Sequence, residues 1–477
     1  MTSPDHPSAS AVLRQLAPSV YLPTLLQAAG VTSLLPVVPL LALQLGFTVP
    51  QAAALTMIAG VGAVLGPIPV SRLMIAVGAR RALIVSGVVM SIGNVVALVV
   101  IGAGLTGDPS TLHRAALIGI LVLFSATSQV WSLGRQSYLG SVLPPRLRAR
   151  GMTTFGGMIR VGQVIGPLLG AGVLALGHDA WVFALFAGLM ALATLMVTVF
   201  MPPGEDTARP GREGNGSEAE HATTSAVAAD PEAAEAVGET VAEESASAAE
   251  VDVAGDEADH AEAATSEVAR DEAAPDPEQT PRAILTRMMR VGIGVTPIMM
   301  GRVNRPVIVP LLGAALGVDA ASISLVFAIA AVLEIVLFIP AGVIMDRFGR
   351  AAVAVPCSVL MGAGYLLLTI LAATVGSSPH AGMVALLVPT LIIAVGNGLG
   401  AGIVMTLGID VSPEHARTRY LGWWNTVIGV GRLASPLMVT LVTMVAPVAA
   451  ASTVCGVLGL LGGAWLLREL PRSIGRI

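Results

Sequence analysis

Charged side chains inside long apolar stretches are the residues of this chain that can do chemistry. Arg302 and Arg305 stand three positions apart, and Glu334 lies near the middle of the next apolar stretch. Two arginines at this spacing share one face of a helix, and each guanidinium can hold a carboxylate or phosphate through two hydrogen bonds. A carboxylate in apolar surroundings can take up and release a proton. The pattern indicates a binding site for a small anionic or zwitterionic molecule, with Glu334 carrying the proton.

The composition makes the bilayer the solvent of this chain. Of its 477 residues, 54% are hydrophobic and 12% are charged, and the mean hydropathy is +0.80. A helix crosses roughly 30 Å of hydrocarbon with about 20 apolar residues, because it satisfies its own backbone hydrogen bonds. The apolar runs predict twelve such helices, at 20–44, 50–74, 81–104, 115–139, 152–175, 179–201, 290–315, 321–344, 351–375, 382–409, 420–445 and 447–467.

Further polar residues within these spans are candidates for the same binding site. An ionisable group at the centre of a bilayer costs about 2.5 to 3.5 kcal/mol, so it usually faces a partner or a cavity. Two other interpretations remain open: Glu334 forms a permanent ion pair that fixes its helix, and two of the arginines extend toward the membrane surface. The additional candidates are Asn304, Gln129, Trp131, Arg135 and Arg160, with Asn397 as a neutral group beside them.

An internal repeat arranges the spans as two lobes. Four anchors of the first half return 271 positions later, so that Pro39, Gly46, Pro69 and Gly78 correspond to Pro310, Gly317, Pro340 and Gly349. A repeat of this length in an apolar chain predicts two six-helix lobes related by pseudo-twofold symmetry, with the working site between them. The predicted organisation is a tail at 1–19, lobes at 20–202 and 282–468, a linker at 203–281 and a tail at 469–477.

The linker and the loops carry opposite charge. Between residues 203 and 281 there are 22 acidic residues and 3 arginines, whereas the rest of the chain has 9 acidic residues and 23 arginines. The linker has no hydrophobic stripe, so we expect it to be disordered, serving as a solvated spacer or as a tether for a basic partner. Arginines follow the even-numbered spans, which places both termini and the linker in the cytoplasm of a multi-pass protein of the cell inner membrane. These arginines are Arg80, Arg81, Arg146, Arg148, Arg150, Arg347, Arg350, Arg417 and Arg419.

The connection between the eighth and ninth spans carries a glycine and charge motif. Its residues are Gly342, Asp346, Arg347, Gly349 and Arg350. They resemble the signature loop of the major facilitator superfamily, and the resemblance implies a cytoplasmic gate. In such a gate Gly342 permits close helix packing, Gly349 permits a sharp reversal, and Asp346 pairs with arginine in one conformation only. Asp410 and the first-lobe residues Gly78, Arg80 and Arg81 belong to the same predicted gate.

The fifth span carries a second resemblance. Gly162, Gly166, Pro167 and Gly170 resemble the glycine and proline motif of the superfamily's drug/proton antiporters. Glycines at this spacing form one flat helix face, and the proline adds a kink. The resemblance implies export. The first lobe departs from the family pattern, because Ile75 and Ser141 stand where the second lobe has Asp346 and Asp410, so the gate should depend mainly on the second lobe.

Together these observations predict a secondary active transporter of small molecules that works by alternating access. The leading hypothesis is proton-coupled efflux of drugs or metabolites. A facilitator or exchanger of organic anions is the second hypothesis, and a non-transporting scaffold that recruits a partner through its linker is the third. The sequence has no phosphate-binding GxxxxGK[ST] loop, which disfavours nucleotide hydrolysis as an energy source. We expect a monomer without enzymatic activity, cofactor, metal or nucleic acid.

Overall fold

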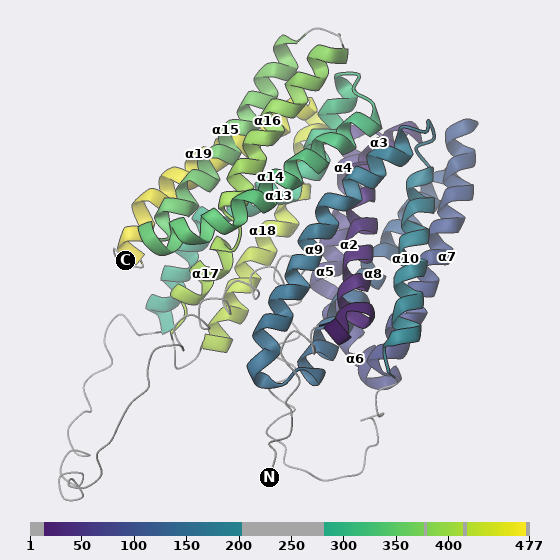
Figure 1. Ribbon diagram of the computed structural model, residues 1–477. Helices are drawn as coiled ribbons and strands as arrows, with labels where there is room; N and C mark the ends of the chain where they lie inside the picture. Colours follow the sequence, from purple (N-terminus) through teal and green to yellow (C-terminus); the bar gives the residue numbers. More distant parts are fainter. Residues whose placement is uncertain (1–13, 203–280, 376–378, 414–416, 474–477) are drawn as a thin grey trace, which may run out of the picture.

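A computed structural model describes residues 14–202, 281–375, 379–413 and 417–473, which form helices and short connections without any strand (Figure 1). The predicted linker lies outside the described residues except for Pro281, as do parts of both predicted tails. In chain order the first half contains η1 (Ala17–Tyr21, a π-helix), α2 (Leu22–Leu34), α3 (Val38–Gln44), α4 (Val49–Leu55), α5 (Met57–Leu65), α6 (Pro67–Val77), α7 (Ala79–Thr106), α8 (Thr111–Val142), α9 (Pro145–Leu174) and α10 (Trp181–Phe200).

The second half begins with the longest helix among the described residues. In chain order it contains α13 (Pro281–Ala315), α14 (Ala320–Phe348), α15 (Ala351–Thr374), α16 (Pro379–Leu399), α17 (Ile403–Asp410), α18 (Arg417–Val445) and α19 (Val448–Ser473). Within the described residues, eleven stretches are long and apolar enough to cross a membrane, and α4 to α6 supply a twelfth that is bent by 57°. The predicted twelve-helix fold is therefore confirmed.

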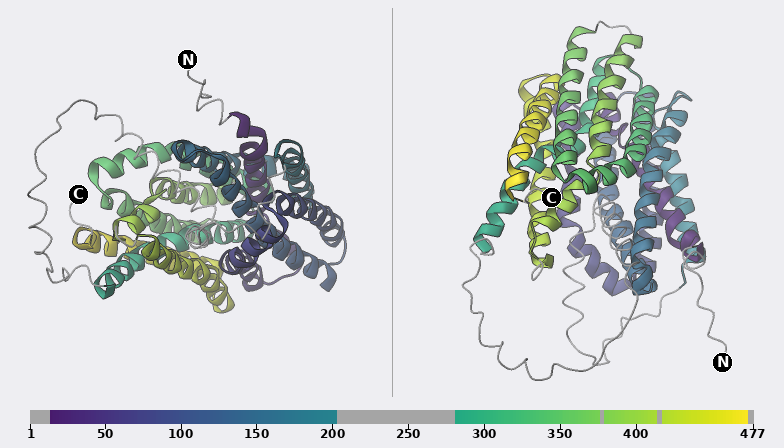
Figure 2. Two further views of the ribbon diagram at one scale, coloured as in Figure 1. Left: turned by 90° about the horizontal axis from the view of Figure 1, so that it is seen from below. Right: turned by 60° about the vertical axis from the view of Figure 1, so that its left-hand side comes forward.

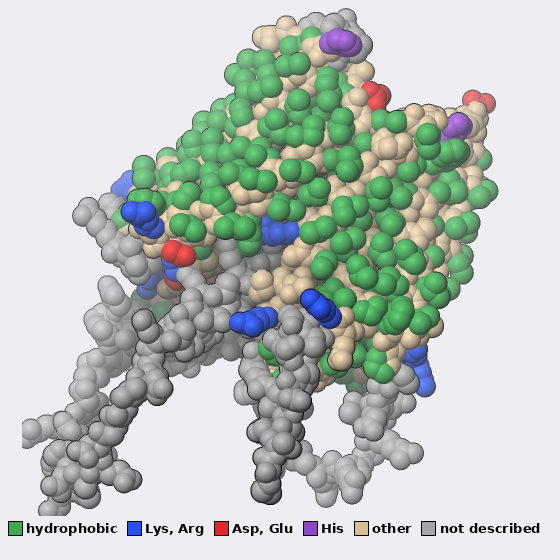
Figure 3. All heavy atoms as spheres, viewed as in Figure 1, with side chains coloured by type: hydrophobic (Ala, Val, Ile, Leu, Met, Phe, Trp, Pro, Cys, Tyr) green, Lys and Arg blue, Asp and Glu red, His purple; other side chains and the backbone are tan. Residues whose placement is uncertain are grey.

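The helices form two bundles that stand side by side (Figures 1 and 2). Helices α2 to α10 make the first lobe, and α13 to α19 make the second. The end of α10 and the start of α13 lie at the same end of the molecule, which we call the linker side; the opposite end is the far side (Figure 1). Apolar side chains cover the outside of both lobes, and arginines gather toward the linker side (Figure 3). This surface suits a lipid environment.

Backbone geometry supports the internal repeat. Gly46 and Gly317 have φ values of 78° and 73°, and Gly78 and Gly349 have φ values of 88° and 83°. These values lie in the left-handed region that glycine adopts without a steric penalty. Each glycine ends a helix at the corresponding place in its lobe. The predicted role of Gly349 in a sharp reversal agrees with this geometry, because α15 begins two residues after it.

The two lobes meet through a small set of helices. Helix α18 packs against α4 and α5, α13 packs against α3, and α14 packs against α9. Helix α6 instead packs against α7 and α8 of its own lobe. The chain bends between Gly66 and Pro67, where a proline ring replaces a hydrogen-bond donor and disfavours a continuous helix. The second span therefore contacts the opposite lobe through its far-side half.

The glycine motif of the fifth span is the contact face between α9 and α2. A Cβ atom on Gly162 would lie 2.6 Å from the Cβ of Ala28, and one on Gly166 would lie within 3 Å of the Ala29 carbonyl oxygen. The hydroxyl of Thr32 donates a hydrogen bond to the carbonyl of Gly162 at 3.1 Å. The motif thus allows two backbones to approach closely, as small residues do in many membrane proteins. Pro167 lies inside α9 on the same stretch.

We predict that Gly166→Ala destabilises the first lobe whereas Gly172→Ala does not. The added methyl group at 166 meets the backbone of α2, and overpacking of this kind costs about 1 to 3 kcal/mol. At Gly172, on the same helix, no atom lies within 4 Å of the new Cβ. Thermal unfolding in detergent should show a lower midpoint for the first variant alone. Equal midpoints for both variants would contradict the proposed packing role.

Candidate functional site

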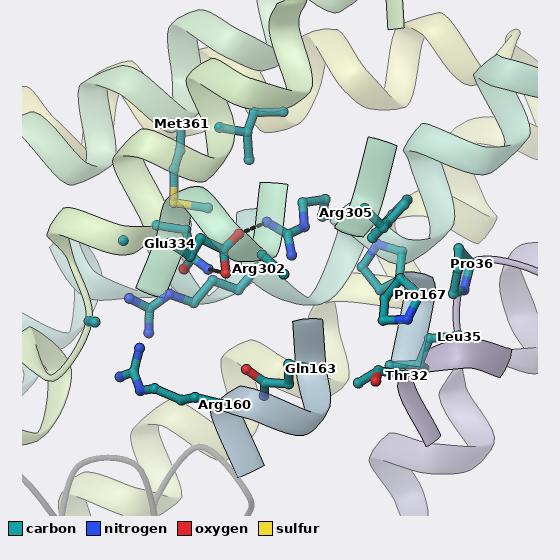
Figure 4. Close-up of a pocket in the computed structure, with 17 residues that line it drawn as sticks. Thr32, Leu35, Pro36, Arg160, Gln163, Pro167, Arg302, Arg305, Glu334 and Met361 are labelled. Atoms are coloured by element: carbon teal, nitrogen blue, oxygen red, sulfur yellow. Dashed lines mark hydrogen bonds and ion pairs between the residues drawn. The ribbon is translucent and has the colours of Figure 1, made fainter. Parts of the chain in front are cut away.

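A cavity of about 200 Å³ lies between the two lobes. Its walls come from α2 and the turn after it, from α9, and from α13 to α16 with the turn that follows α16. The side chains converge on its centre from both lobes (Figure 4). The cavity is lined by Thr32, Leu35, Pro36, Arg160, Gln163, Pro167, Arg302, Arg305, Pro306, Phe327, Ala331, Glu334, Met361, Ile393, Asn397, Gly398 and Ala401.

An ion pair between Arg305 and Glu334 joins α13 to α14 in the cavity wall (Figure 4). The side chains are 15% and 14% exposed, so both charges are largely removed from solvent. The second carboxylate oxygen of Glu334 accepts a hydrogen bond of 2.9 Å from the amide of Asn397 on α16. The Arg305 guanidinium also lies 5.5 Å from the centre of the Phe327 ring. The only deep carboxylate predicted from the sequence is thus held by groups on two other helices.

Arg302 reaches a break in the tenth span. Its guanidinium donates a hydrogen bond of 2.6 Å to the carbonyl of Gly400. Helix α16 ends at Leu399 and α17 begins at Ile403, and Gly402 between them has φ of 77°. The predicted span at 382–409 therefore corresponds to α16 and α17 together, which this turn separates. The signal was present in the sequence, because glycine occupies 398, 400 and 402, and alternate glycines disfavour a helix while tolerating a left-handed turn.

The first lobe contributes one positive charge to the cavity. Arg160 on α9 is 8% exposed, and its guanidinium lies 3.8 Å from the centre of the Phe338 ring on α14. This cation–π contact crosses from one lobe to the other. Three arginines and one glutamate line the cavity, so its walls carry an excess of positive charge.

Four of the residues predicted to bind substrate do not line this cavity. Trp131 is fully buried and Arg135 is 2% exposed, and Arg135 donates hydrogen bonds to the carbonyl of Trp131 and to Gln27. Gln129 packs against the bend at Gly66. Asn304, on the other side of its helix from the cavity, lies 3.3 Å from the sulfur of Cys455. These side chains are buried outside this cavity, so a role in substrate binding for Gln129, Trp131, Arg135 and Asn304 stays a prediction.

The structure adds residues that sequence reasoning missed. Gln163, Phe327 and Met361 line the cavity, and Phe338 carries the contact with Arg160. Gln163 could have been noticed as an amide inside the apolar fifth span, directly after Gly162. The phenylalanines and Met361 had no distinguishing signal, since apolar residues line every surface of such a helix.

The predicted gate residues of the second lobe lie on the linker side, and only some of them form an ion pair. Arg350 at the start of α15 pairs with Asp410 at the end of α17, with Nε and Oδ2 3.1 Å apart. Asp346 and Arg347 are exposed, and among the described residues Asp346 has no ion pair. Gly342 has open space where a Cβ would lie, so the expected close packing at this glycine is absent in this conformation.

The first-lobe gate residues make a different contact. Arg80, just after the turn at Gly78, donates hydrogen bonds of 2.7 Å to the carbonyls of Thr198 and Met201. It therefore attaches the start of α7 to the end of α10 within one lobe. Arg81 beside it is exposed.

A sequence profile described as the Major Facilitator Superfamily matches residues 20–251 and 291–477. The chain belongs to the major facilitator superfamily. It is a multi-pass membrane transporter, and its lobes and interlobe cavity fit that family. A search of curated proteins gives no match for it.

Solved structures of the same fold come from POT family transporters. One, in complex with a thioalcohol-conjugated peptide, has a TM-score of 0.64 and 12% identity, covering 97% of this chain and 96% of that chain. Another is a variant of the peptide transporter POT in complex with sulfate, with a TM-score of 0.65 and 14% identity, covering 97% and 95%. At this identity the likeness shows the shared superfamily fold, and it does not single out the drug/proton antiporter branch.

We predict that Arg305 and Glu334 are energetically coupled. Glu334→Gln or Arg305→Gln alone leaves one buried charge without its counter-ion, at a cost of roughly 3 kcal/mol or more. The double variant removes both charges, so its loss of stability should be clearly smaller than the sum of the single losses. Thermal unfolding in detergent measures all three variants. Glu334→Gln combined with Arg302→Gln is the control, because Arg302 lies on the same helix face outside the ion pair. Additive losses for Arg305 and Glu334 would contradict the coupling.

Proposed function

We propose that this transporter couples the movement of a small carboxylate- or phosphate-bearing solute to the movement of a proton. The observation that carries the proposal is the group of Arg160, Arg302 and Arg305 around a single carboxylate, Glu334, in the interlobe cavity. Guanidinium groups match carboxylate and phosphate oxygens in two-point contacts, and a low-dielectric cavity strengthens those contacts. The lining has three arginines and one glutamate, and this set of side chains suits an anion or a zwitterion.

The size of the cavity favours a small solute. Its volume of about 200 Å³ is below the roughly 300 to 1,000 Å³ typical of pockets for drug-sized ligands. Arg160 belongs to the first lobe and Arg302 to the second, and both face the same space (Figure 4). An anion that contacts both arginines would bring the lobes into a fixed relation. Such an anion would bind more tightly to the conformation in which both arginines reach it than to one in which the lobes are apart. Alternating access requires this difference in affinity between conformations.

Proton coupling follows from the competition for Arg305. While Glu334 is ionised it is the counter-ion of Arg305. Protonation of Glu334 removes that attraction, and the Arg305 guanidinium becomes available to the solute anion. The amide of Asn397 can remain bonded to the carboxyl group in either state, since an amide offers both a donor and an acceptor. The cavity therefore binds the solute anion at Arg305 when Glu334 is protonated, so that solute and proton are bound at the same time.

Ligands in the related structures guide the choice of probes. POT family structures hold a thioalcohol-conjugated peptide, 5-aminolevulinic acid and sulfate. The last two bear an anionic group of the kind that the cavity arginines would recognise. Peptides, amino acids and inorganic anions are therefore the first compounds to try.

The distribution of arginines supports a cytoplasmic linker side, with the cell inner membrane as the location. The motif in α9 implied export, whereas a solute that binds together with the proton, as proposed above, would move in the same direction as the proton. That motif serves as a helix-packing face, with Gly162 and Gly166 against α2, and such a face is compatible with transport in either direction.

An anion exchanger without proton coupling is the second candidate, because the arginines outnumber the glutamate three to one in the cavity. In that case the Arg305–Glu334 pair would be permanent, and one anion would replace another at Arg302 and Arg160. The scaffold hypothesis has no support from the cavity, since a tether has no need for charged groups between the lobes.

Glu334→Gln should abolish proton flux while preserving exchange of the solute. Liposomes with trapped pyranine report proton movement when dialanine, 5-aminolevulinic acid or inorganic phosphate is added outside. We expect at least one probe to drive proton flux with the unaltered chain, and none with Glu334→Gln, because glutamine keeps the shape but cannot ionise. Counterflow of the labelled probe should persist. Asp108→Asn, in a far-side loop, is the matched control.

Two results would overturn the proposal in different ways. Unchanged proton-driven accumulation in Glu334→Gln excludes this residue as the proton carrier, whereas counterflow of the probe without any proton flux in the unaltered chain favours the exchanger. Replacement of both Arg302 and Arg305 by alanine should then collapse anion exchange. If that double variant still transports anions and also exports a cationic compound, the cavity arginines do not select the solute.

Asp346→Asn should slow transport far more than Ile75→Ala. Asp346 lies in the last turn of α14 on the linker side, and α14 packs against α9, whose first turn begins at Pro145 on the same side. Closure of that side would bring the carboxylate to the positive end of α9, while Ile75 offers no charge at the corresponding place. A contribution of 1 kcal/mol or more from Asp346 changes the ratio of closed to open conformations by roughly fivefold or more. The initial rate of uptake into liposomes measures the effect. Equal rates for the two variants would show that the gate does not depend on the second lobe.

A further inference from the structure

A second cavity lies on the far side of the first lobe. It occupies about 640 Å³ between the end of α3, the end of α7 and the start of α10. We call it the far-side groove, and its lining includes Gln44, Leu98, Leu105, Asp179 and Trp181. It shares no lining residue with the interlobe cavity. Three membrane-spanning helices begin or end here, so the groove lies at the level of lipid head groups.

The polar side of the groove offers hydrogen-bond acceptors and one negative charge. Gln44 donates a hydrogen bond of 2.6 Å to one carboxylate oxygen of Asp179. Among the described residues, neither the other oxygen of Asp179 nor the amide oxygen of Gln44 accepts a side-chain hydrogen bond. The groove lining contains no arginine. These acceptors and the carboxylate charge match a cation that carries several N–H donors.

An aromatic pair completes the polar end. The rings of His178 and Trp181 are stacked, with centroids 5.3 Å apart and planes inclined by 18°, and both residues line the groove. An ammonium group is attracted to an aromatic face, and the indole of tryptophan gives the strongest attraction. A carboxylate beside an aromatic pair is therefore a recognisable ammonium site.

The apolar side of the groove continues onto the lipid-facing surface. Val95 and Val99 on α7 are 50% and 65% exposed, and they stand seven positions before Gly102 and Thr106, which line the groove. Residues seven apart share a helix face. On α10, Gly188 stands seven positions after Trp181 and therefore on the same helix face. A Cβ atom at Gly188 would have no neighbouring atom within 4 Å, so this face is open. Acyl chains can extend from the groove along this surface.

We propose that the far-side groove binds a phospholipid whose head group ends in a primary ammonium, as in phosphatidylethanolamine. Its three N–H donors match the acceptors of Asp179 and Gln44, whereas a trimethylammonium head group has no N–H to donate. The acyl chains distinguish this occupant from a water-soluble amine, because the apolar wall of α7 leads into the bilayer. This lipid site is separate from the proposed solute site, because the two cavities share no lining residue.

The test uses the purified full chain with an equimolar mixture of dioleoyl phosphatidylethanolamine and dioleoyl phosphatidylcholine in detergent micelles. Native mass spectrometry then counts the bound lipids of each kind. The unaltered chain should retain phosphatidylethanolamine in preference, by roughly tenfold, the factor expected for one charge-assisted hydrogen bond. Asp179→Asn should abolish the preference, and Trp181→Leu should weaken it. Asp108→Asn is the matched control, because it removes a far-side carboxylate outside the groove.

Several outcomes would overturn the proposal. They are equal retention of both lipids by the unaltered chain, an unchanged preference in Asp179→Asn, and loss of the preference in Asp108→Asn. Displacement of the bound lipid by an equal concentration of phosphoethanolamine would show that a soluble amine is the ligand. Glu334→Gln should keep the lipid preference, so that failure of the transport proposal and failure of this one remain distinguishable. Unfolding midpoints of all variants identify any loss of binding that comes from loss of the fold.

Discussion

A charge in the interior of a bilayer must be compensated by a neighbouring group, and this constraint organises the middle of the molecule. Arg305 is compensated by Glu334, Arg302 by the carbonyl of Gly400, and Arg160 by the ring of Phe338. Three kinds of partner thus serve three arginines in one cavity. Glu334 and Phe338 lie on α14 and Gly400 lies in the turn between α16 and α17, so each contact links the helix of its arginine to another part of the fold.

The same constraint explains why the two lobes differ although their backbones repeat. The turns at Gly46 and Gly78 have counterparts at Gly317 and Gly349, which shows that the duplicated framework is preserved. The charges are not preserved. At a shift of 269 positions, Gly400 and Gly402 of the broken tenth span correspond to Trp131 and Leu133 in the continuous helix α8. The second lobe therefore contains the ion pair, the break near Gly402 and the carboxylates of the predicted gate, whereas the first lobe provides one cavity arginine and a tightly packed frame.

The sequence was a good guide to the fold because the bilayer requires every helix that crosses it to be long and apolar. A span needs about 20 apolar residues, and a repeat of punctuating glycines and prolines shows where spans begin and end. The sequence was a weaker guide to the site. Neighbours on one helix point in different directions, so Arg302 and Arg305 face the cavity whereas Asn304 between them faces Cys455. In a helix surrounded by lipid, lobe interior and cavity, hydrophobic periodicity does not tell these three surfaces apart. The bend at Gly66 and the break at Gly402 likewise depend on how neighbouring helices support the freed backbone.

The arrangement of α13 connects the cavity with the linker side through ordinary contacts. Arg302 holds the carbonyl that precedes α17, and α17 ends at Asp410, which pairs with Arg350 at the start of α15. The indole of Trp424 on α18 also donates a hydrogen bond of 2.9 Å to the carbonyl of Val404 in α17. Helix α17 is therefore a short rigid piece attached at one end to a cavity arginine and at the other to a gate residue. If the proposed solute draws the Arg302 guanidinium away from Gly400, this hydrogen bond is lost while the ion pair and the Trp424 contact remain. Under the proposed function, this two-ended attachment would give solute binding a physical route to the predicted gate, because the short helix would have different contacts before and after the solute arrives.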